Sequence, residues 1–392
     1  MKYREDKYGN QLSVLGFGCM RFKKKLGRIN MEDAERQIMS AYNKGVNYFD
    51  TAFIYPGSEA AIGEIFEKNN IRDKIYIATK LPPQLMRSID ILDKLLSEQL
   101  KRLRTDHIDY FLFHMMADIK VWERLKSMGI ERWIEEKKAA GTIRQFGFSY
   151  HGGSDMFCKI LDAFDWDMCL IQYNYMDEHT QAGRKGLYRA HEKGIPVMIM
   201  EPLRGGRLVK NLPSEATDIF KNHPVQHTPA QWAFRWLYNQ PEITVVLSGM
   251  NTDEMVADNV KTATEAKIGE LTAEDEAMLK GVVRAINAKL KVPCTGCGYC
   301  MPCPQKINIS GTFSAYNKKY SDSNFSGLRE YAKCTLSKDS APASACIGCG
   351  KCEQHCPQAI EIRKLLKEAA TELETPAYNT ISKAVKAVKR KK

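Results

Sequence analysis

Short apolar segments recur along most of the chain, and the stretches between them carry apolar residues at helical spacing. A turn is predicted at Gly9-Asn10, within a leading hairpin around Lys7–Leu12. The alternation favours an α/β fold, a (β/α)8 TIM barrel with a jacket of helices. The alternative, a doubly wound open sheet, is weakened because no Gly-x-Gly-x-x-Gly loop follows the first strand. The eight predicted strands are Val14–Gly18, Val46–Asp50, Ile75–Lys80, Ile108–Phe113, Ile143–Ser149, Met168–Gln172, Pro196–Met200 and Thr244–Ser248.

The pattern changes near residue 290. Thr272 is the predicted N-cap of the last barrel helix, because three acidic residues follow it where they favour a helix N-terminus. That helix is expected to end near Leu290. Beyond Pro293-Cys294 apolar periodicity is sparse, so we expect cofactors, and not a core, to hold a small domain together. The predicted parts are a barrel at residues 1–285, a small cysteine-bearing domain at 286–368 and a basic tail at 369–392.

Composition narrows the class of protein. The 392 residues are 44% hydrophobic, enough for a sizeable core, and no apolar run approaches the ~18 residues that span a bilayer. Met1–Asn10 is polar and has no signal-peptide core, so a soluble cytoplasmic protein is expected, without a membrane partner. The net charge is +11, but no nucleic-acid-reading motif accompanies it. We interpret the basic end as a solvated tail, or as a docking patch for an acidic electron carrier. Its basic residues are Lys383, Lys386, Lys389, Arg390, Lys391 and Lys392.

Four polar residues lie at or just after predicted strand ends, and together they suit hydride transfer to a carbonyl. The carbonyl oxygen needs a proton or a strong hydrogen bond as charge develops on it. Tyr55 can supply that proton if a cation lowers its pKa from ~10, and Lys80 is the candidate cation. Asp50 would keep Lys80 charged, and His114 would orient the substrate oxygen. In a barrel, all four would meet at the C-terminal mouth.

Eight of the twelve cysteines form two tight clusters. Cys-x-x-Cys spacing without a secretory signal favours metal ligation over disulfides. The second cluster, Cys346, Cys349, Cys352 and Cys356 followed by Pro357, agrees with the four-iron bacterial ferredoxin run. The first, Cys294, Cys297, Cys300 and Cys303 followed by Pro304, is one residue shorter before its last cysteine. Two sets of four thiolates favour two 4Fe–4S clusters over zinc.

Residues 1 to about 285 resemble the aldo-keto reductase family. The resemblance implies a barrel fold, with Tyr55 as general acid supported by Asp50, Lys80 and His114. It also implies a nicotinamide cofactor lying across the barrel mouth. Ser149 and Gln172 match positions that hold the carboxamide. The matches to the pyrophosphate and adenosine contacts are Leu203, Gly205, Gly206, Ser248, Gly249 and Asn259. The matching stretches are Leu15-Gly16-Phe17-Gly18, Phe49-Asp50-Thr51-Ala52 with Tyr55, Lys80, the His114 strand, Gly147-Phe148-Ser149, Gln172-Tyr173-Asn174, Pro202-Leu203 and Ser248-Gly249 with Asn259.

Three positions depart from the family pattern. Met200 stands where many members stack an aromatic ring on the nicotinamide, and Tyr150 stands where many have Asn. Met255 replaces an Arg that binds the 2′-phosphate of NADP, and it follows Asp253 and Glu254, which would repel a phosphate. The sequence therefore predicts NAD(P) without a preference for NADP, and it leaves room for a flavin.

The cysteine region resembles two-cluster ferredoxins, so the chain as a whole resembles the iron–sulfur branch of the aldo-keto reductases. That resemblance implies crossed ligation. One cluster would take the first three cysteines of the first motif with Cys356, and the other would take Cys303 with the first three of the second motif. Ligation within each motif is the alternative.

The leading hypothesis is an oxidoreductase that acts on a small carbonyl or alcohol and exchanges electrons with ferredoxin or another carrier through its clusters. One alternative is a reductase whose clusters are purely structural. Another is a redox-sensing module that binds nucleotide without turnover, which retention of the acid Tyr55 disfavours.

Overall fold

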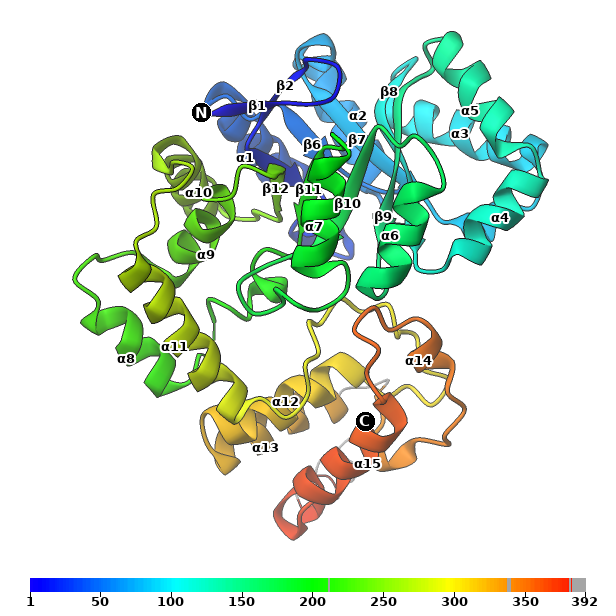
Figure 1. Cartoon of the computed structure of the whole chain (residues 1–392). Helices are drawn as coiled ribbons and strands as arrows, with labels where there is room; N and C mark the ends of the chain where they lie inside the picture. Colours follow the sequence, from blue (N-terminus) through cyan, green and yellow to red (C-terminus); the bar gives the residue numbers. More distant parts are fainter. Residues whose placement is uncertain (211, 337–339, 381, 383–392) are drawn as a thin grey trace. The chain divides into compact units, whose positions relative to one another are not determined.

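The computed structural model describes residues 1–210, 212–336, 340–380 and 382. The chain forms two compact units (Figure 1). The barrel unit comprises Met1–Pro202 and Ala230–Leu271. The cysteine unit comprises the described residues of Leu203–Pro229 and Thr272–Lys392.

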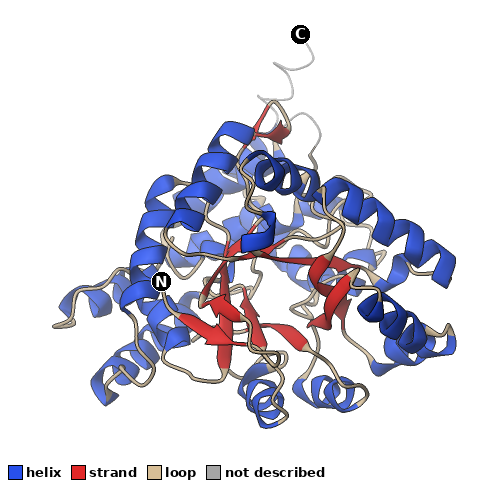
Figure 2. Ribbon diagram, turned by 90° about the horizontal axis from the view of Figure 1, so that it is seen from above, coloured by secondary structure: helices blue, strands red, loops and turns tan. Residues whose placement is uncertain are grey.

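The barrel unit contains a closed barrel of parallel strands, which confirms the predicted fold. Every predicted strand is present, with ends that differ by at most a few residues. Both faces of these strands are buried, as expected for near-continuous apolar runs in a parallel sheet. Figure 2 shows strands in red and helices in blue. Around the barrel the strand order is β3 (Leu15–Gly18), β6 (Tyr48–Asp50), β7 (Tyr76–Leu81), β8 (Ile108–Met116), β9 (Ile143–Tyr150), β10 (Met168–Gln172), β11 (Val197–Met200) and β12 (Ile243–Ser248).

Amphipathic helices connect the strands. Ser88 begins one of them by accepting a hydrogen bond from Ile91 N, and Asp118 and Thr252 begin two others in the same way. The predicted hairpin is present as β1 (Tyr3–Glu5) and β2 (Gln11–Ser13), and a second, exposed hairpin pairs β4 (Lys24–Lys25) with β5 (Arg28–Ile29). The helices are α1 (Met31–Asn43), α2 (Ser58–Lys68), α3 (Ile89–Leu103), α4 (Ile119–Ser127), α5 (Ile130–Ala139), α6 (Ser154–Asp162), α7 (Gly183–Glu192), α9 (Pro229–Tyr238) and α10 (Asp253–Glu265).

The cysteine unit is helical. Thr272 caps α11 as predicted, in a capping box with Asp275. Helix α11 packs against α8, and α12 packs against α13 and α15. The helices are α8 (Ser214–Asn222), α11 (Ala273–Lys289), α12 (Ile309–Ser321), α13 (Asn324–Thr335), α14 (Lys351–Gln354) and α15 (Ile362–Leu373).

The expectation that this unit lacks a core is wrong. Helices α12 and α13 form within the stretch between the two cysteine motifs, and each buries an apolar face together with α15. Each of these helices is short and contributes only a few apolar residues. No single helix therefore predicts a core from the sequence, and the core forms only where several helices pack together. The buried residues are Val292, Ile307, Ile309, Phe313, Ala315, Tyr316, Tyr331, Ala343, Ile360, Ile362, Leu366, Ala369, Leu373 and Tyr378.

The compact units differ from the three parts predicted from the sequence. Helices α8 and α11 belong to the cysteine unit, and α15 runs through residue 369, where the basic tail was expected to begin. The predicted boundaries remain a prediction. The basic residues from Lys383 onward lie outside the described residues. Among the described helices, none combines the length and hydropathy needed to cross a membrane.

Candidate active site and cysteine-lined cavities

Three of the four predicted catalytic residues lie on neighbouring strands. Asp50 ends β6, Lys80 lies near the end of β7, and His114 lies on β8. Because these strands are parallel and adjacent, their carboxyl ends share the barrel mouth. Lys80 Nζ donates to Asp50 Oδ1 at 2.6 Å and to the carbonyl oxygen of Thr51 at 2.7 Å. Asp50, Lys80 and His114 are all buried.

Tyr55 completes the group from the turn between β6 and α2. Its ring centroid lies 5.0 Å from Lys80 Nζ. It also lies 5.9 Å from the centroid of the His114 ring, which it meets edge-on at 83°. Tyr55 is half-buried, whereas the other three side chains are buried. The structure therefore brings the four residues together, and Tyr55 is the most exposed of them.

Burial sets the charges of this group. Burial raises the pKa of Asp50, and the Lys80 ammonium opposes that shift. Burial lowers the pKa of His114 well below its usual value, and the nearby Lys80 charge lowers it further. His114 is therefore a neutral imidazole near pH 7. It can form hydrogen bonds, but it is not an imidazolium that could act as an acid.

Cys19 follows β3 and is buried beside the same ion pair. Burial raises the pKa of its thiol well above the usual value, and Asp50 adds to this shift. The thiol is therefore neutral and inert, in agreement with a packing role.

Ser149 and Gln172, the predicted carboxamide positions, lie on the paired strands β9 and β10 and are buried. Ser149 Oγ accepts a hydrogen bond from Met115 N at 2.9 Å. Its own hydroxyl donates to no described group, so it fits a carboxamide oxygen. Gln172 accepts from Gln181 Nε2 and donates to an Asp177 carboxylate oxygen, both at 2.9 Å, which fixes the orientation of its amide.

Sequence reasoning missed His151, which follows β9 directly. It is 8% exposed, and its Nδ1 lies 3.2 Å from Gln181 Oε1. Burial lowers the pKa of His151 to about 4, and His151 contributes to the lowered pKa of His114. The same rule that selected His114, a histidine at a strand end, would have selected His151 in the Ser149-Tyr150-His151 run. Gln181, in the loop before α7, gave no such signal.

The remaining predicted cofactor positions fall in both units. Ser248 ends β12 and accepts from Asn259 Nδ2 of α10 at 2.8 Å, and both are buried. Gly249 follows in the loop. A Cβ added there would lie 3.2 Å from Cδ of Arg21, which is closer than ordinary van der Waals contact. Leu203, Gly205 and Gly206 begin the cysteine unit, and both glycines have positive φ.

The acidic start of α10 is partly neutralised. Asp253 Oδ2 pairs with Arg36 Nε at 2.9 Å, and both side chains are half-exposed. The repulsion of a phosphate expected from Asp253 is therefore weaker than the sequence suggests, because a guanidinium lies beside that carboxylate.

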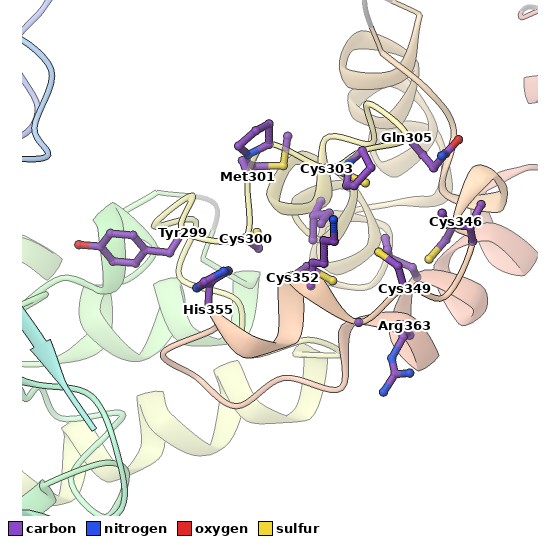
Figure 3. A pocket seen from close by; sticks show the side chains of 17 residues that line it. Tyr299, Cys300, Met301, Cys303, Gln305, Cys346, Cys349, Cys352, His355 and Arg363 are labelled. Atoms are coloured by element: carbon purple, nitrogen blue, oxygen red, sulfur yellow. The ribbon is translucent and has the colours of Figure 1, made fainter. Parts of the chain in front are cut away.

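The eight clustered cysteines line two cavities, and each cavity takes cysteines from both motifs. Cys303 lines one cavity together with Cys346, Cys349 and Cys352, and Cys300 reaches the same cavity (Figure 3). Cys356 lines the other together with Cys294, Cys297 and Cys300. Among the described residues, no three His, Cys, Asp or Glu side chains converge to hold a single metal ion.

The two cysteine motifs share a backbone conformation at their glycines. Glycines flank the second cysteine of each motif, and all four have φ between 73° and 83°, a conformation that favours glycine. They are Gly296, Gly298, Gly348 and Gly350. The repeated left-handed positions turn both loops so that successive cysteines line a common cavity. Four thiolates around a cavity can bind an iron–sulfur cluster. The ligands of a cluster lie farther apart than the ligands of a single metal ion.

Comparisons with known proteins match both units. The aldo/keto reductase family model matches residues 14–284, and a 4Fe-4S dicluster domain model matches residues 293–360. An aldo-keto reductase of Mycobacterium avium is 27% identical over 251 residues, which cover 64% of this chain and 80% of that protein. The NAD/NADP-dependent indole-3-acetaldehyde reductase of Schizosaccharomyces pombe is 30% identical over 235 residues, which cover 59% of this chain and 78% of that protein. A solved aldo-keto reductase of Klebsiella pneumoniae in complex with NADPH shares the fold, with a TM-score of 0.57 at 21% identity over 71% of this chain and 94% of that one.

Proposed function

The chain belongs to the aldo/keto reductase family, and we propose that its barrel reduces a small-molecule carbonyl, or oxidises the alcohol, with NAD(P) and with Tyr55 as the proton donor. The observation that carries the proposal is the environment of Tyr55. Lys80, in a buried ion pair with Asp50, has its Nζ 5.0 Å from the centroid of the Tyr55 ring, and that ring meets the neutral His114 ring edge-on. When bound, the nicotinamide supplies the hydride.

The four side chains have different roles in the transfer of the proton from Tyr55 to the substrate oxygen. The Lys80 ammonium stabilises negative charge that develops on the Tyr55 oxygen as its proton leaves. Asp50 holds Lys80 in place through the 2.6 Å contact. His114, neutral because it is buried, donates or accepts a hydrogen bond at the substrate oxygen without competing as an acid. Ser149 and Gln172 would orient the carboxamide from the adjoining strands.

Residues of opposite charge lie near the predicted position of the 2′-phosphate. Met255 offers no charge to a 2′-phosphate, but Arg36 of α1 pairs with Asp253 at the start of α10 and brings a positive charge there. Met200 ends β11 without an aromatic face. Flavin remains a second occupant to be tested, because a flavin bridges hydride chemistry and one-electron carriers.

In the cysteine unit, which matches a 4Fe-4S dicluster domain, we assign two 4Fe–4S clusters with crossed ligation. The two cavities support this assignment, because each gathers three cysteines of one motif with the last cysteine of the other. Such clusters exchange single electrons, and a ferredoxin-type carrier is the partner that fits them.

A structural role for the clusters is the second candidate. Six of the clustered cysteines pack against the apolar core of the unit: Cys294, Cys300, Cys303, Cys346, Cys352 and Cys356. Under this candidate, Cys349→Ser lowers stability and affects turnover only through folding. Under electron transfer, it lowers carrier-dependent turnover in protein that remains folded.

The test of the barrel proposal is steady-state oxidation of NADPH and of NADH with a panel of aldehydes and ketones. Tyr55→Phe should lower kcat by about 10²–10⁴-fold, the usual contribution of a positioned general acid. Tyr188→Phe, on the exposed surface of α7, is the matched control and should leave kcat unchanged. Wild-type turnover in Tyr55→Phe would contradict the proposal.

A further inference from the structure

The two cysteine-lined cavities differ in size and in charge. The larger cavity, lined by Cys303, Cys346, Cys349 and Cys352, has a volume of about 190 Å³, and the smaller cavity, lined by Cys356, has about 20 Å³. Apart from cysteines, no ionisable side chain is found among the described lining residues of the smaller cavity. The larger cavity has three basic lining residues and, among those described, no acidic one. They are Lys351, His355 and Arg363.

The cavities also differ in exposure. Phe313 and Ile362 line the smaller cavity and belong to the apolar core of the unit, and each is 1% exposed. The larger cavity is bordered by Ile347, which is 64% exposed, and by Met301, which is 37% exposed. Among the eight clustered cysteines, all of which the structure describes, Cys349 alone is exposed, and it lines the larger cavity. The larger cavity is therefore the one that opens to the surface of the cysteine unit.

The basic residues of the larger cavity stand in different surroundings. Arg363 Nη2 of α15 lies 2.8 Å from Glu353 Oε2, so part of its charge is offset, although Glu353 does not line the cavity. Lys351 begins α14 and is exposed, as is His355 directly after that helix. Figure 3 shows His355 and Arg363 among the lining side chains. An apolar patch with a polar and charged rim is the usual composition of a protein–protein interface.

We infer that the rim of the larger cavity is the docking surface for a small acidic electron-carrier protein. This docking rim consists of Met301, Ile347, Lys351, His355 and Arg363. Its cations complement an acidic surface and would steer such a carrier to the cavity. A free anion would leave Ile347 and Met301 in water, whereas a protein partner buries them. Contacts between electron-transfer proteins are small and transient, so a rim of few residues is enough for one. The inference rests on the proposed clusters, because a carrier docked here would lie beside the more exposed of the two cluster sites.

The experiment is calorimetric titration of an acidic bacterial ferredoxin, and separately of an acidic flavodoxin, into the full-length, anaerobically purified protein. Wild-type binding should weaken as the salt concentration rises, because ions screen exposed charges. Lys351→Glu should weaken binding about 10-fold or more, since it places like charges opposite each other. Ile347→Asp should weaken binding as well, because it places an acid in the apolar patch. Lys333→Glu, which makes the same charge change on the exposed surface of α13, should bind like wild type.

Iron content, the visible spectrum and the melting temperature show whether each variant keeps its clusters and its fold. Absence of iron from the wild-type protein would overturn the cluster assignment and the docking with it. Full iron without carrier binding at hundred-micromolar concentrations overturns the docking alone, as does wild-type affinity in both Lys351→Glu and Ile347→Asp. A redox titration followed by electron paramagnetic resonance separates docking from tuning of a cluster. A shifted cluster potential at unchanged affinity would assign these side chains to the cluster and not to a partner, and it would also overturn the inference.

Discussion

Replacing Lys80 by Met removes the charge on which the proposed chemistry depends while it keeps an unbranched side chain of similar length. The ammonium lies 5.0 Å from the Tyr55 ring centroid. At an effective dielectric constant of about 20, a unit charge at that distance stabilises the phenolate by roughly 3 kcal/mol. That energy corresponds to about 10²-fold in rate. The expected result is therefore a fall of about 10²-fold in kcat/KM for carbonyl reduction.

The same change also affects stability. Lys80 and Asp50 form a buried ion pair, with side chains 2% and 6% exposed. Removing one partner of a buried pair costs about 3–5 kcal/mol, because the other charge is left uncompensated. Asp50 already has a raised pKa from burial, and without Lys80 it rises further, so protonation of Asp50 limits the loss. Asp50→Asn added to Lys80→Met should recover part of the melting temperature but none of the activity.

The assay is kcat/KM with a carbonyl that the wild-type protein reduces, at saturating cofactor and pH 7, together with melting temperature. Lys101→Met, which removes an exposed charge from α3, is the matched control. A Lys80→Met enzyme with kcat/KM within about threefold of wild type would refute the electrostatic reasoning, since the calculated energy predicts roughly 10²-fold.

Three other changes test separate parts of the account. The folded-state pKa of His151 is about 4, below the ~6.5 of an unfolded chain, so its contribution to stability is lost as pH falls through that window. The fall in melting temperature from pH 7 to pH 5 should therefore be smaller in His151→Gln than in wild type; an equal fall would remove His151 as a cause. The double variant Cys303→Ser with Cys346→Ser should retain about four irons per chain if ligation is crossed, and should lose both clusters if ligation is local. Leu373→Ala should cost about 2–5 kcal/mol of stability at unchanged iron content, which calorimetry would show as a lower melting temperature; an unchanged melting temperature would mean that the apolar core of the cysteine unit contributes little.

Local pattern was sufficient to predict the barrel. A parallel strand buried on both faces is a short apolar run, so Met168–Gln172 was predicted with its observed ends. The grouping of the four predicted catalytic residues could be predicted in the same way. Residues at the carboxyl ends of parallel strands meet at one mouth of the barrel, as Asp50 and Lys80 do.

Features that depend on distant segments could not be predicted. The core of the cysteine unit joins residues as far apart as Val292 and Tyr378, and no single helix there shows it. The Arg36–Asp253 pair connects α1 to α10, so the sequence alone presented Asp253 as an unopposed charge. His151 differs from these features, because it is a histidine directly after a strand, as His114 is a histidine at a strand end, and its position could therefore be predicted from the sequence.

The proposed function depends above all on direct hydride transfer at the barrel mouth. It is tested most directly by reducing a carbonyl with nicotinamide cofactor carrying deuterium at C4 on the transferred face, in ordinary water, and measuring the alcohol by mass spectrometry. The product of the wild-type protein should carry one deuterium on the former carbonyl carbon, and Tyr55→Phe should form little product. Product formed without deuterium would rule out direct transfer, because the hydrogen would then have passed through a carrier that exchanges with solvent.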